Sequence, residues 1–342
     1  MNQTKTSMIY ELTGPRVLEF KKERIDLSSL GSDYLFAKTI FSAISTGTEL
    51  AAWTGKPPLR PSTQYPRLLG YGNVARVEMI GDNINDLDVG DFILTQQSHR
   101  DSFYCNKREV LIHAKNINQF DQKLMVIAYL YLLGYLALID SKYCPGMDVS
   151  IVGLGALGFS SASLVSVYGG AVKIYSDRVN ASQFSKLIPF SECLKKSNNE
   201  ITSQLDKVLN DADIVINTSD SWDDYELSLK LVRPGGCVAL IGFPGRGDAI
   251  PTFNPLDSKY LYDKSITIRQ IGHVSDLDIP PVDLRFTLKR NIAHIFSLLQ
   301  TRRVDPTPLL SSLYPFNNLK DAYEMLEKRN TFNLSCILDW TC

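Results

Sequence analysis

The residues with the clearest chemical signature are three glycines near the middle of the chain, Gly153, Gly155 and Gly158. A β-prone apolar run over 149–152 precedes them, and a helix-forming run over 159–168 follows. In such a turn the first glycine permits a tight bend, the second lets the backbone approach a pyrophosphate, and the third lets the helix pack on the strand. The helix start, at Ala156 and Leu157, offers unpaired N–H groups to phosphates. The pattern predicts a dinucleotide site, and the alternative is a glycine-rich turn with a structural role alone.

The type of dinucleotide is indicated by the next apolar run, over 172–176, which ends at Asp177. An acid at this spacing hydrogen-bonds the adenosine ribose hydroxyls of NAD(H) and repels the 2′-phosphate of NADP(H). The neighbouring Arg178 offers an alternative, because it can reach a 2′-phosphate or stack on adenine. The sequence therefore favours NAD(H) and leaves NADP(H) open.

Two further pairs, Asn217-Thr218 and Gly242-Phe243, end predicted strands over 213–217 and 237–241. In a parallel sheet the carboxyl ends of the strands border the cofactor crevice. We therefore expect both pairs beside the nicotinamide, and a structural turn is the alternative for each.

The elements around these residues fall into three segments. Residues 1–120 carry short apolar runs between turn signals, which is typical of a β-rich segment. After an apolar helix over 124–139, strands over 149–152, 172–176, 213–217, 237–241 and 266–271 alternate with helices, and this order indicates a doubly wound parallel sheet of the α/β class. Helices over 286–300 and 318–329 and a strand over 334–338 follow. We predict a dinucleotide-binding domain over 123–280, inserted into a second domain made of 1–122 and 281–342.

Composition excludes several classes of function. The chain has 342 residues and a net charge of −1, so no overall field draws it to nucleic acid or to a membrane surface. Its six cysteines are scattered without a Cys-x-x-Cys, which argues against a disulfide framework and a cysteine-rich zinc lobe.

The first ten residues lack the apolar core of a secretory signal. The apolar run over 124–139 is shorter than the about 18 residues of a spanning helix, so we expect a cytoplasmic protein without a membrane partner.

Several landmarks, together with this order of domains, resemble the medium-chain dehydrogenase/reductase superfamily of zinc-type alcohol dehydrogenase-like proteins. Thr46-Gly47-Thr48-Glu49 is similar to its Cys-Gly-Thr-Asp, and Leu69-Gly70-Tyr71-Gly72 through Val77 is similar to its Leu-Gly-His-Glu-x-x-Gly-x-Val. Val89-Gly90-Asp91 and Val232-Arg233-Pro234-Gly235-Gly236 match two further turns of the superfamily. The stretch 43–49 also resembles the branch that holds bacteriochlorophyllide hydroxyethyl dehydrogenase. The resemblance covers nearly the whole chain and implies a GroES-like β-rich domain with an inserted Rossmann domain.

The same resemblance predicts that the catalytic metal is missing. In zinc members a Cys, a His and a further Cys or acid hold the metal, and the matching positions here are Thr46, Tyr71 and Tyr129. Threonine and neutral tyrosine are poor zinc ligands beside thiolate and imidazole. We therefore expect no zinc in this protein.

Without a Lewis acid, another group must polarise the reacting carbonyl or protonate the product, and hydroxyl donors can do this by hydrogen bonding. The resemblance places Thr48 against the substrate oxygen and directs Tyr71 and Tyr129 into the metal pocket, where a phenol can act as general acid. The alternative is that both tyrosines fill the space of the metal. Three residues are expected beside the substrate, with a structural role as the alternative for each: Thr46, Trp53 and His273.

These residues together predict a zinc-independent, NAD(P)(H)-dependent oxidoreductase in a biosynthetic pathway. Hydride would pass between nicotinamide and a carbonyl or alcohol of a small-molecule substrate in the interdomain cleft. An enoyl or quinone-type C=C reductase and a non-catalytic NAD(P)-binding protein are the alternatives. The resemblance also implies a homodimer joined through the strand over 266–271.

Overall fold

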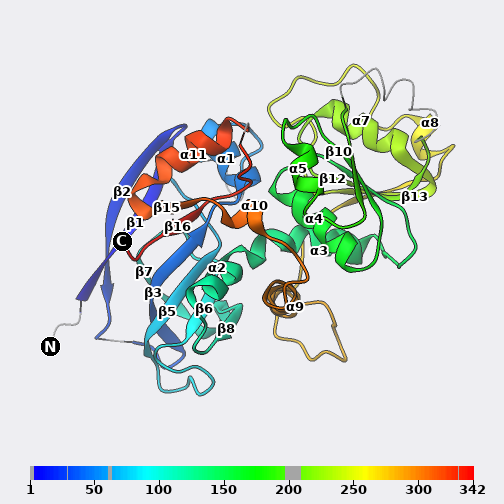
Figure 1. Ribbon diagram of the computed structural model, residues 1–342. Helices are drawn as coiled ribbons and strands as arrows, with labels where there is room; N and C mark the ends of the chain where they lie inside the picture. Colours follow the sequence, from blue (N-terminus) through cyan, green and yellow to red (C-terminus); the bar gives the residue numbers. More distant parts are fainter. Residues whose placement is uncertain (1–3, 29, 61–63, 197–208, 330) are drawn as a thin grey trace.

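The computed structural model describes residues 4–28, 30–60, 64–196, 209–329 and 331–342, and these form two lobes joined by helices (Figure 1). The β-rich lobe holds an antiparallel sheet in the order β2-β1-β4 and a larger sheet in the order β15-β16-β3-β5-β6-β8, with β7 paired to β3. Its strands are β1 (Thr4–Gly14), β2 (Val17–Asp26), β3 (Tyr34–Ala43), β4 (Arg67–Leu68), β5 (Asn73–Ile80), β6 (Phe92–Thr95), β7 (Ser102–Asn106), β8 (Ile112–Ala114), β15 (Leu313–Pro315) and β16 (Ile337–Asp339).

The two ends of the chain meet in this lobe. Strand β16 pairs antiparallel with β3, with Ile337 opposite Ala43, and β15 extends the sheet beyond β16. The helices of the C-terminal segment are α9 (Leu288–Gln300), α10 (Thr307–Leu310) and α11 (Leu319–Glu327). Helix α11 packs against α1 (Thr46–Thr54) of the N-terminal segment. The flanks of the inserted segment therefore share one sheet and one core.

The other lobe is a parallel sheet of the order β11-β10-β9-β12-β13-β14. Its elements are β9 (Val149–Val152), α4 (Ala156–Val167), β10 (Val172–Tyr175), α5 (Ala181–Ser185), β11 (Ser191–Leu194), β12 (Ala212–Asn217), α7 (Trp222–Leu231), β13 (Val232–Leu240), α8 (Ser258–Leu261) and β14 (Thr267–Gln270). Strands β10 and β11 lie on one side of β9, and β12, β13 and β14 lie on the other, so the strand order reverses between β9 and β12. At such a point this architecture has a crevice that binds ligands. The predicted α/β fold with a doubly wound parallel sheet is confirmed, and β11 is a strand that the sequence patterns did not predict.

The lobes are connected by a run of helices, α2 (Gln119–Ile127), η2 (Ala128–Tyr131) and α3 (Leu132–Asp140). Helix α2 packs on β3 and β5, and α3 packs on α4, where an added Cβ on Gly134 would lie 2.9 Å from Ser161 Cα. The helical run over 119–140 has 22 residues and is long and apolar enough to cross a membrane, so it extends beyond the predicted apolar run over 124–139. However, 72% of its apolar window is buried inside the protein, as expected for a core helix.

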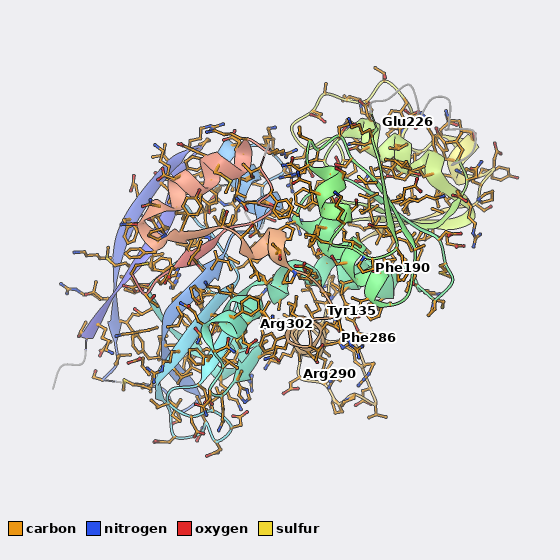
Figure 2. All side chains as sticks on the ribbon, in the orientation of Figure 1. Tyr135, Phe190, Glu226, Phe286, Arg290 and Arg302 are labelled. Atoms are coloured by element: carbon orange, nitrogen blue, oxygen red, sulfur yellow. The ribbon has the colours of Figure 1, made fainter. Side chains whose placement is uncertain are left out.

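Helix α9 lies beside this run and presents its apolar side to it, with Ile292 and Ile295 buried. Arg290 of α9 lies beside the loop that precedes the helix (Figure 2). It donates hydrogen bonds to the carbonyls of Leu284 and Ile279, which fixes this loop. A single buried apolar cluster extends from β3 through α2 and α3 to the parallel sheet. The orientation of the two lobes therefore depends on close packing rather than on a flexible linker.

Candidate active site and dinucleotide site

The three glycines at the start of α4 have the three geometries that a dinucleotide turn requires. Gly153 has a φ of 97°, and its amide donates to the carbonyl of Tyr175 at 3.0 Å, which ties the turn to the end of β10. An added Cβ on Gly158 would lie 2.0 Å from the Gly153 oxygen, so helix and strand could not approach as they do. An added Cβ on Gly155 would meet no atom within 4 Å, because this backbone borders open space. These observations fit a bound pyrophosphate in front of Gly155.

The first turn of α4 supplies the donors for such a phosphate. Ala156 is buried and Leu157 is half-buried, and both stand at the helix N-terminus, where backbone N–H groups lack partners within the helix. The positive end of the helix dipole points in the same direction. The residues present therefore fit the phosphates of a nicotinamide dinucleotide.

At the adenosine end the structure separates Asp177 from Arg178. Asp177 is exposed just beyond the end of β10, where a ribose can meet its carboxylate. Arg178 reaches the other lobe with one nitrogen: its Nη2 donates to the carbonyls of Thr331 at 3.1 Å and Asn333 at 3.4 Å. Its desolvation by burial lowers the pKa of the guanidinium. The Nη2 group of Arg178 is therefore committed to backbone carbonyls of the C-terminal segment.

The residues at the carboxyl ends of β12 and β13 mainly contact one another and the glycine turn, and these contacts stabilise the walls of the crevice. The Asn217 side chain is fully buried and hydrogen-bonds Ser228 Oγ and the Ser219 amide, so the prediction that it contacts nicotinamide is wrong. Thr218 Oγ1 lies 3.2 Å from the Gly153 oxygen, and an added Cβ on Gly242 would lie 2.2 Å from the Ser219 oxygen. Through these contacts the ends of β9, β12 and β13 pack closely against the glycine turn.

Phe243 begins the loop that crosses to the other lobe. Its amide donates to Asp220 Oδ1 at 2.9 Å, and its ring lies under the Arg246 guanidinium at 4.3 Å. Nη1 of Arg246 donates to the carbonyl of Gly47 at 3.1 Å, at the start of α1. The cofactor crevice and the N-terminus of α1 are therefore directly adjacent.

Three of the predicted hydroxyl donors come together at this N-terminus. The Tyr71 hydroxyl hydrogen-bonds Ser45 Oγ and lies 3.4 Å from Thr48 Oγ1. The rings of Tyr71 and Tyr129 meet edge to face with centroids 5.3 Å apart. Gln96 donates from Nε2 to the Tyr129 oxygen at 2.7 Å, so the phenolic proton of Tyr129 stays available for another acceptor.

Burial sets the protonation of both phenols. It raises the pKa of Tyr71 to about 12, against the smaller lowering effects of the hydrogen bonds with Ser45 and Thr48. It also raises the pKa of Tyr129, against the hydrogen bond from Gln96. Both groups are therefore neutral phenols at physiological pH and can donate protons or hydrogen bonds.

Behind Tyr71, a buried carboxylate fixes the backbone of the site. Glu49 Oε1 accepts the Ser45 amide at 2.7 Å, and Oε2 accepts from the Tyr323 hydroxyl at 2.6 Å and faces His99 Nε2 at 2.9 Å. The other ring nitrogen of His99 lies 2.8 Å from Ser42 Oγ. Ser42, His99 and Glu49 have the connectivity of a nucleophilic triad, but they are 0%, 0% and 2% exposed. No substrate reaches them, so this network positions Ser45, the hydrogen-bond partner of Tyr71.

The remaining predicted substrate contacts do not all join the cluster. Thr46 is half-buried at the first position of α1, next to Gly47. Trp53 is 1% exposed and stacks on Tyr323 with centroids 5.4 Å apart, so the prediction that it meets a substrate is wrong: the turn of α1 directs it into the core. His273 is exposed in the segment that follows β14.

The donor set does not suit zinc. The positions that hold the metal in zinc members are occupied by Thr46, Tyr71 and Tyr129, which offer neutral hydroxyls instead of thiolate or imidazole. In the described part of the chain, no three His, Cys, Asp or Glu side chains are grouped to hold a metal ion. These side chains are therefore poorly suited to hold a catalytic zinc.

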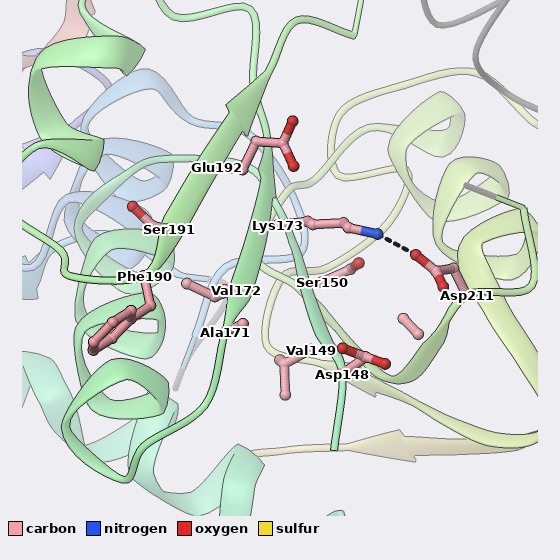
Figure 3. Close-up of a pocket in the computed structure, with 11 residues that line it drawn as sticks. Asp148, Val149, Ser150, Ala171, Val172, Lys173, Phe190, Ser191, Glu192 and Asp211 are labelled. Carbon is pink, nitrogen blue, oxygen red and sulfur yellow. Dashed lines mark hydrogen bonds and ion pairs between the residues drawn. The ribbon is translucent and has the colours of Figure 1, made fainter. Parts of the chain in front are cut away.

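A hollow of about 280 Å³ lies at the opposite edge of the parallel sheet (Figure 3). It is lined by the first residues of β9, β10, β11 and β12, and Lys173 and Asp211 form an ion pair within it. Because this architecture binds its ligands at the carboxyl ends of the strands, the hollow is not the dinucleotide site.

Searches with the sequence returned distant dehydrogenases, and no family model matches the chain. The chain is 21% identical to L-galactonate-5-dehydrogenase of Escherichia coli (strain K12), with 91% of this chain and 92% of that protein covered. It is 19% identical to sorbitol dehydrogenase of Bacillus subtilis (strain 168), with 90% of each chain covered. It is 22% identical to a zinc-type alcohol dehydrogenase-like protein of Staphylococcus epidermidis, with 78% of this chain and 83% of that protein covered.

Solved structures show the same fold over the whole length. L-idonate 5-dehydrogenase from Escherichia coli superposes with a TM-score of 0.80 at 16% identity, covering 98% of this chain and 99% of that one. Acetophenone reductase from Geotrichum candidum, in complex with NAD, gives a TM-score of 0.76 at 16% identity and covers 98% and 97%. A putative zinc-binding dehydrogenase from Sinorhizobium meliloti, bound to NADP, gives 0.74 at 12% and covers 98% and 99%.

Four residues of the site lie outside the sequence predictions: Ser45, Gln96, His99 and Arg246. Ser45 precedes a predicted site residue, and Gln96 follows the end of β6, so position alone could have suggested both. His99 and Arg246 reach the site only through contacts distant in sequence, for which the chain carries no local signal.

Proposed function

We propose that this chain is a member of the medium-chain dehydrogenase/reductase superfamily and that it is a zinc-independent oxidoreductase of small-molecule carbonyls or alcohols. NAD(H) is the preferred cofactor in this proposal, because an exposed Asp177 follows β10, where an acid selects a ribose, and Nη2 of Arg178 is held by carbonyls. The named relatives and structural neighbours are dehydrogenases and reductases, which supports the reaction class.

The observation that carries the proposal is the hydroxyl cluster of Tyr71, Thr48 and Tyr129 beside the dinucleotide crevice. The bound nicotinamide would supply or accept the hydride. Tyr71, a neutral phenol, would hold or deliver the proton at the substrate oxygen, while Thr48 and Tyr129 would donate hydrogen bonds to the charge that develops there.

The orientation of these donors comes from the protein. Ser45 Oγ hydrogen-bonds the Tyr71 hydroxyl, and Gln96 Nε2 donates to the Tyr129 oxygen, which leaves the phenolic proton of Tyr129 for another acceptor. Because the donors are neutral, the site favours an uncharged carbonyl or hydroxyl group over a carboxylate or phosphate at the reacting position.

An assay of NADH oxidation with a panel of ketones and aldehydes beside a panel of enones tests this function. Turnover of ketones or aldehydes is the expected result, and Tyr71→Phe is expected to reduce kcat more than it reduces the affinity for NADH. Turnover of enones alone would instead establish a C=C reductase. Tight NADH binding without turnover of either panel would establish a non-catalytic protein.

We further propose a cytoplasmic homodimer with a biosynthetic role, in which β14 at the edge of the parallel sheet pairs with its copy. Thr267 and Arg269 of this strand are exposed, and Gln270 beside them is exposed too, so the edge is accessible. Light scattering of the wild type and of Ile268→Pro checks this, because proline removes an N–H that pairing requires. A monomeric wild type would contradict it.

A further inference from the structure

Arg246 links the cofactor crevice to the hydroxyl cluster through a single side chain. It is 4% exposed in the loop after β13, and its Nη1 donates to the carbonyl of Gly47 at 3.1 Å. Gly47 stands between Thr46 and Thr48 in the first turn of α1. This hydrogen bond ties the loop after β13, at the nicotinamide end of the crevice, to the backbone next to Thr48, one of the proposed hydroxyl donors.

Another nitrogen of this guanidinium, Nε of Arg246, is buried and has no acceptor among the described residues. Asp220, the nearest acid, lies 3.7 Å from Nη1. A buried N–H without an acceptor is costly, so a ligand oxygen is the expected partner. The position of the loop, at the carboxyl end of β13, restricts that ligand to the nicotinamide half of a dinucleotide.

The other end of the crevice repeats this arrangement. Arg178 follows β10, donates across to the carbonyls of Thr331 and Asn333, and also has a buried Nε without an acceptor among the described residues. The two arginines stand after strands β10 and β13, on either side of the glycine turn that follows β9. A dinucleotide in the crevice would extend between them.

We propose that Arg246 is a cofactor-positioning residue that binds an oxygen of the nicotinamide half through Nε while Nη1 holds α1. One side chain then sets the distance between the hydride-carrying ring and the Thr48 hydroxyl. In the same way, Arg178 binds an oxygen of the adenosine half through Nε, while its Nη2 holds the C-terminal segment at Thr331 and Asn333. The proposal rests on the proposed function only in requiring that a nicotinamide dinucleotide binds.

Calorimetric binding of NADH and AMP to the intact protein tests the assignment without any substrate. Arg246→Met is expected to weaken NADH binding about tenfold and to leave AMP binding unchanged. Arg178→Met is expected to weaken both ligands. Arg233→Met is the matched control, because Arg233 pairs with Asp213 at the amino end of β13, away from the crevice, and should change neither affinity.

A structural role for Arg246 would give a different pattern. Unchanged NADH affinity in a folded Arg246→Met protein, or equal losses of NADH and AMP, would overturn the proposal. If the Met variant does not fold, Arg246→Lys gives the same comparison, since lysine keeps the charge but not the two fixed donors. In turnover, Arg246→Met should lower kcat as well as raise the KM for NADH, whereas Arg178→Met should raise KM alone.

NADH binding and turnover, both measured on wild-type protein, distinguish the failure of this proposal from the failure of the proposed function. NADH binding without turnover would contradict the hydride-transfer function and leave the binding comparison intact. If wild-type protein binds no NADH, the dinucleotide assignment and the role of Arg246 are both wrong.

Discussion

Tyr71 shows at the scale of one residue how the site differs from that of zinc members. By resemblance it stands where a histidine binds the metal, but its oxygen hydrogen-bonds Ser45 and Thr48. Burial raises its pKa to about 12, and the nearby carboxylate of Glu49 also disfavours its ionisation. The environment therefore stabilises a phenol that donates, not a phenolate that could bind a metal.

This environment predicts a pH dependence. The raised pKa keeps Tyr71 protonated through the neutral and mildly alkaline range, so carbonyl reduction should not slow until the pH approaches about 12. Tyr71→Phe should lower kcat for reduction on the order of 10²-fold or more at every pH, because the acid is lost. The pH profiles of kcat for both proteins provide the measurement. An alkaline limb at much lower pH that disappears in Tyr71→Phe would show that the phenol is not held in its neutral form.

A second prediction at this scale concerns Asp177. Asp177→Ala should reduce the preference for NADH over NADPH about tenfold, because the repulsion of the 2′-phosphate is removed. The ratio of kcat/KM for the two cofactors measures it. Glu192→Ala, which removes an exposed acid of β11 at the amino edge of the sheet, is the control. An unchanged ratio in Asp177→Ala would mean that another group selects the cofactor.

At the scale of elements, two glycines at the junction of β9 and α4 have different roles, one in packing and one in leaving space for a ligand. Gly158 allows contact between helix and strand, whereas Gly155 leaves space in front of the helix N-terminus. The same side-chain addition should therefore affect stability at one position and cofactor binding at the other.

The matched pair Gly155→Ala and Gly158→Ala tests this division. Gly155→Ala should keep the melting temperature of the wild type and weaken NADH binding at least about tenfold, because its Cβ takes the space of the pyrophosphate. Gly158→Ala should lower the melting temperature, because its Cβ would lie 2.0 Å from the Gly153 oxygen. Normal NADH affinity in Gly155→Ala would argue against phosphate binding at this turn.

For the whole molecule, the absence of suitable ligands at the metal positions predicts independence of zinc. Purified protein should contain well under one zinc per chain, and a chelator should leave NADH turnover unchanged. Elemental analysis and assays before and after chelation provide the two measurements. Stoichiometric zinc whose removal abolishes turnover would contradict the metal-free proposal.

The lobes meet through packed helices and through arginines that cross between them. Arg246 and Arg178 each donate from the parallel-sheet lobe to carbonyls of the other lobe, near opposite ends of the crevice. In the proposed site, cofactor affinity and the geometry of the hydroxyl donors are therefore coupled, because residues of both lobes form it.

The amino-acid sequence was enough to predict the dinucleotide turn, the alternation of strands and helices, and the poor metal ligands at Tyr71 and Tyr129. These features are local or depend on periodicity, so short-range geometry fixes them. It did not identify Trp53 as a core residue or Asn217 as a structural one, because the direction of a side chain depends on what packs beside it. The contact of Arg246 with Gly47, 199 residues apart, and the network around Glu49 were decided by the tertiary structure, since only the packing of the two lobes brings those groups together.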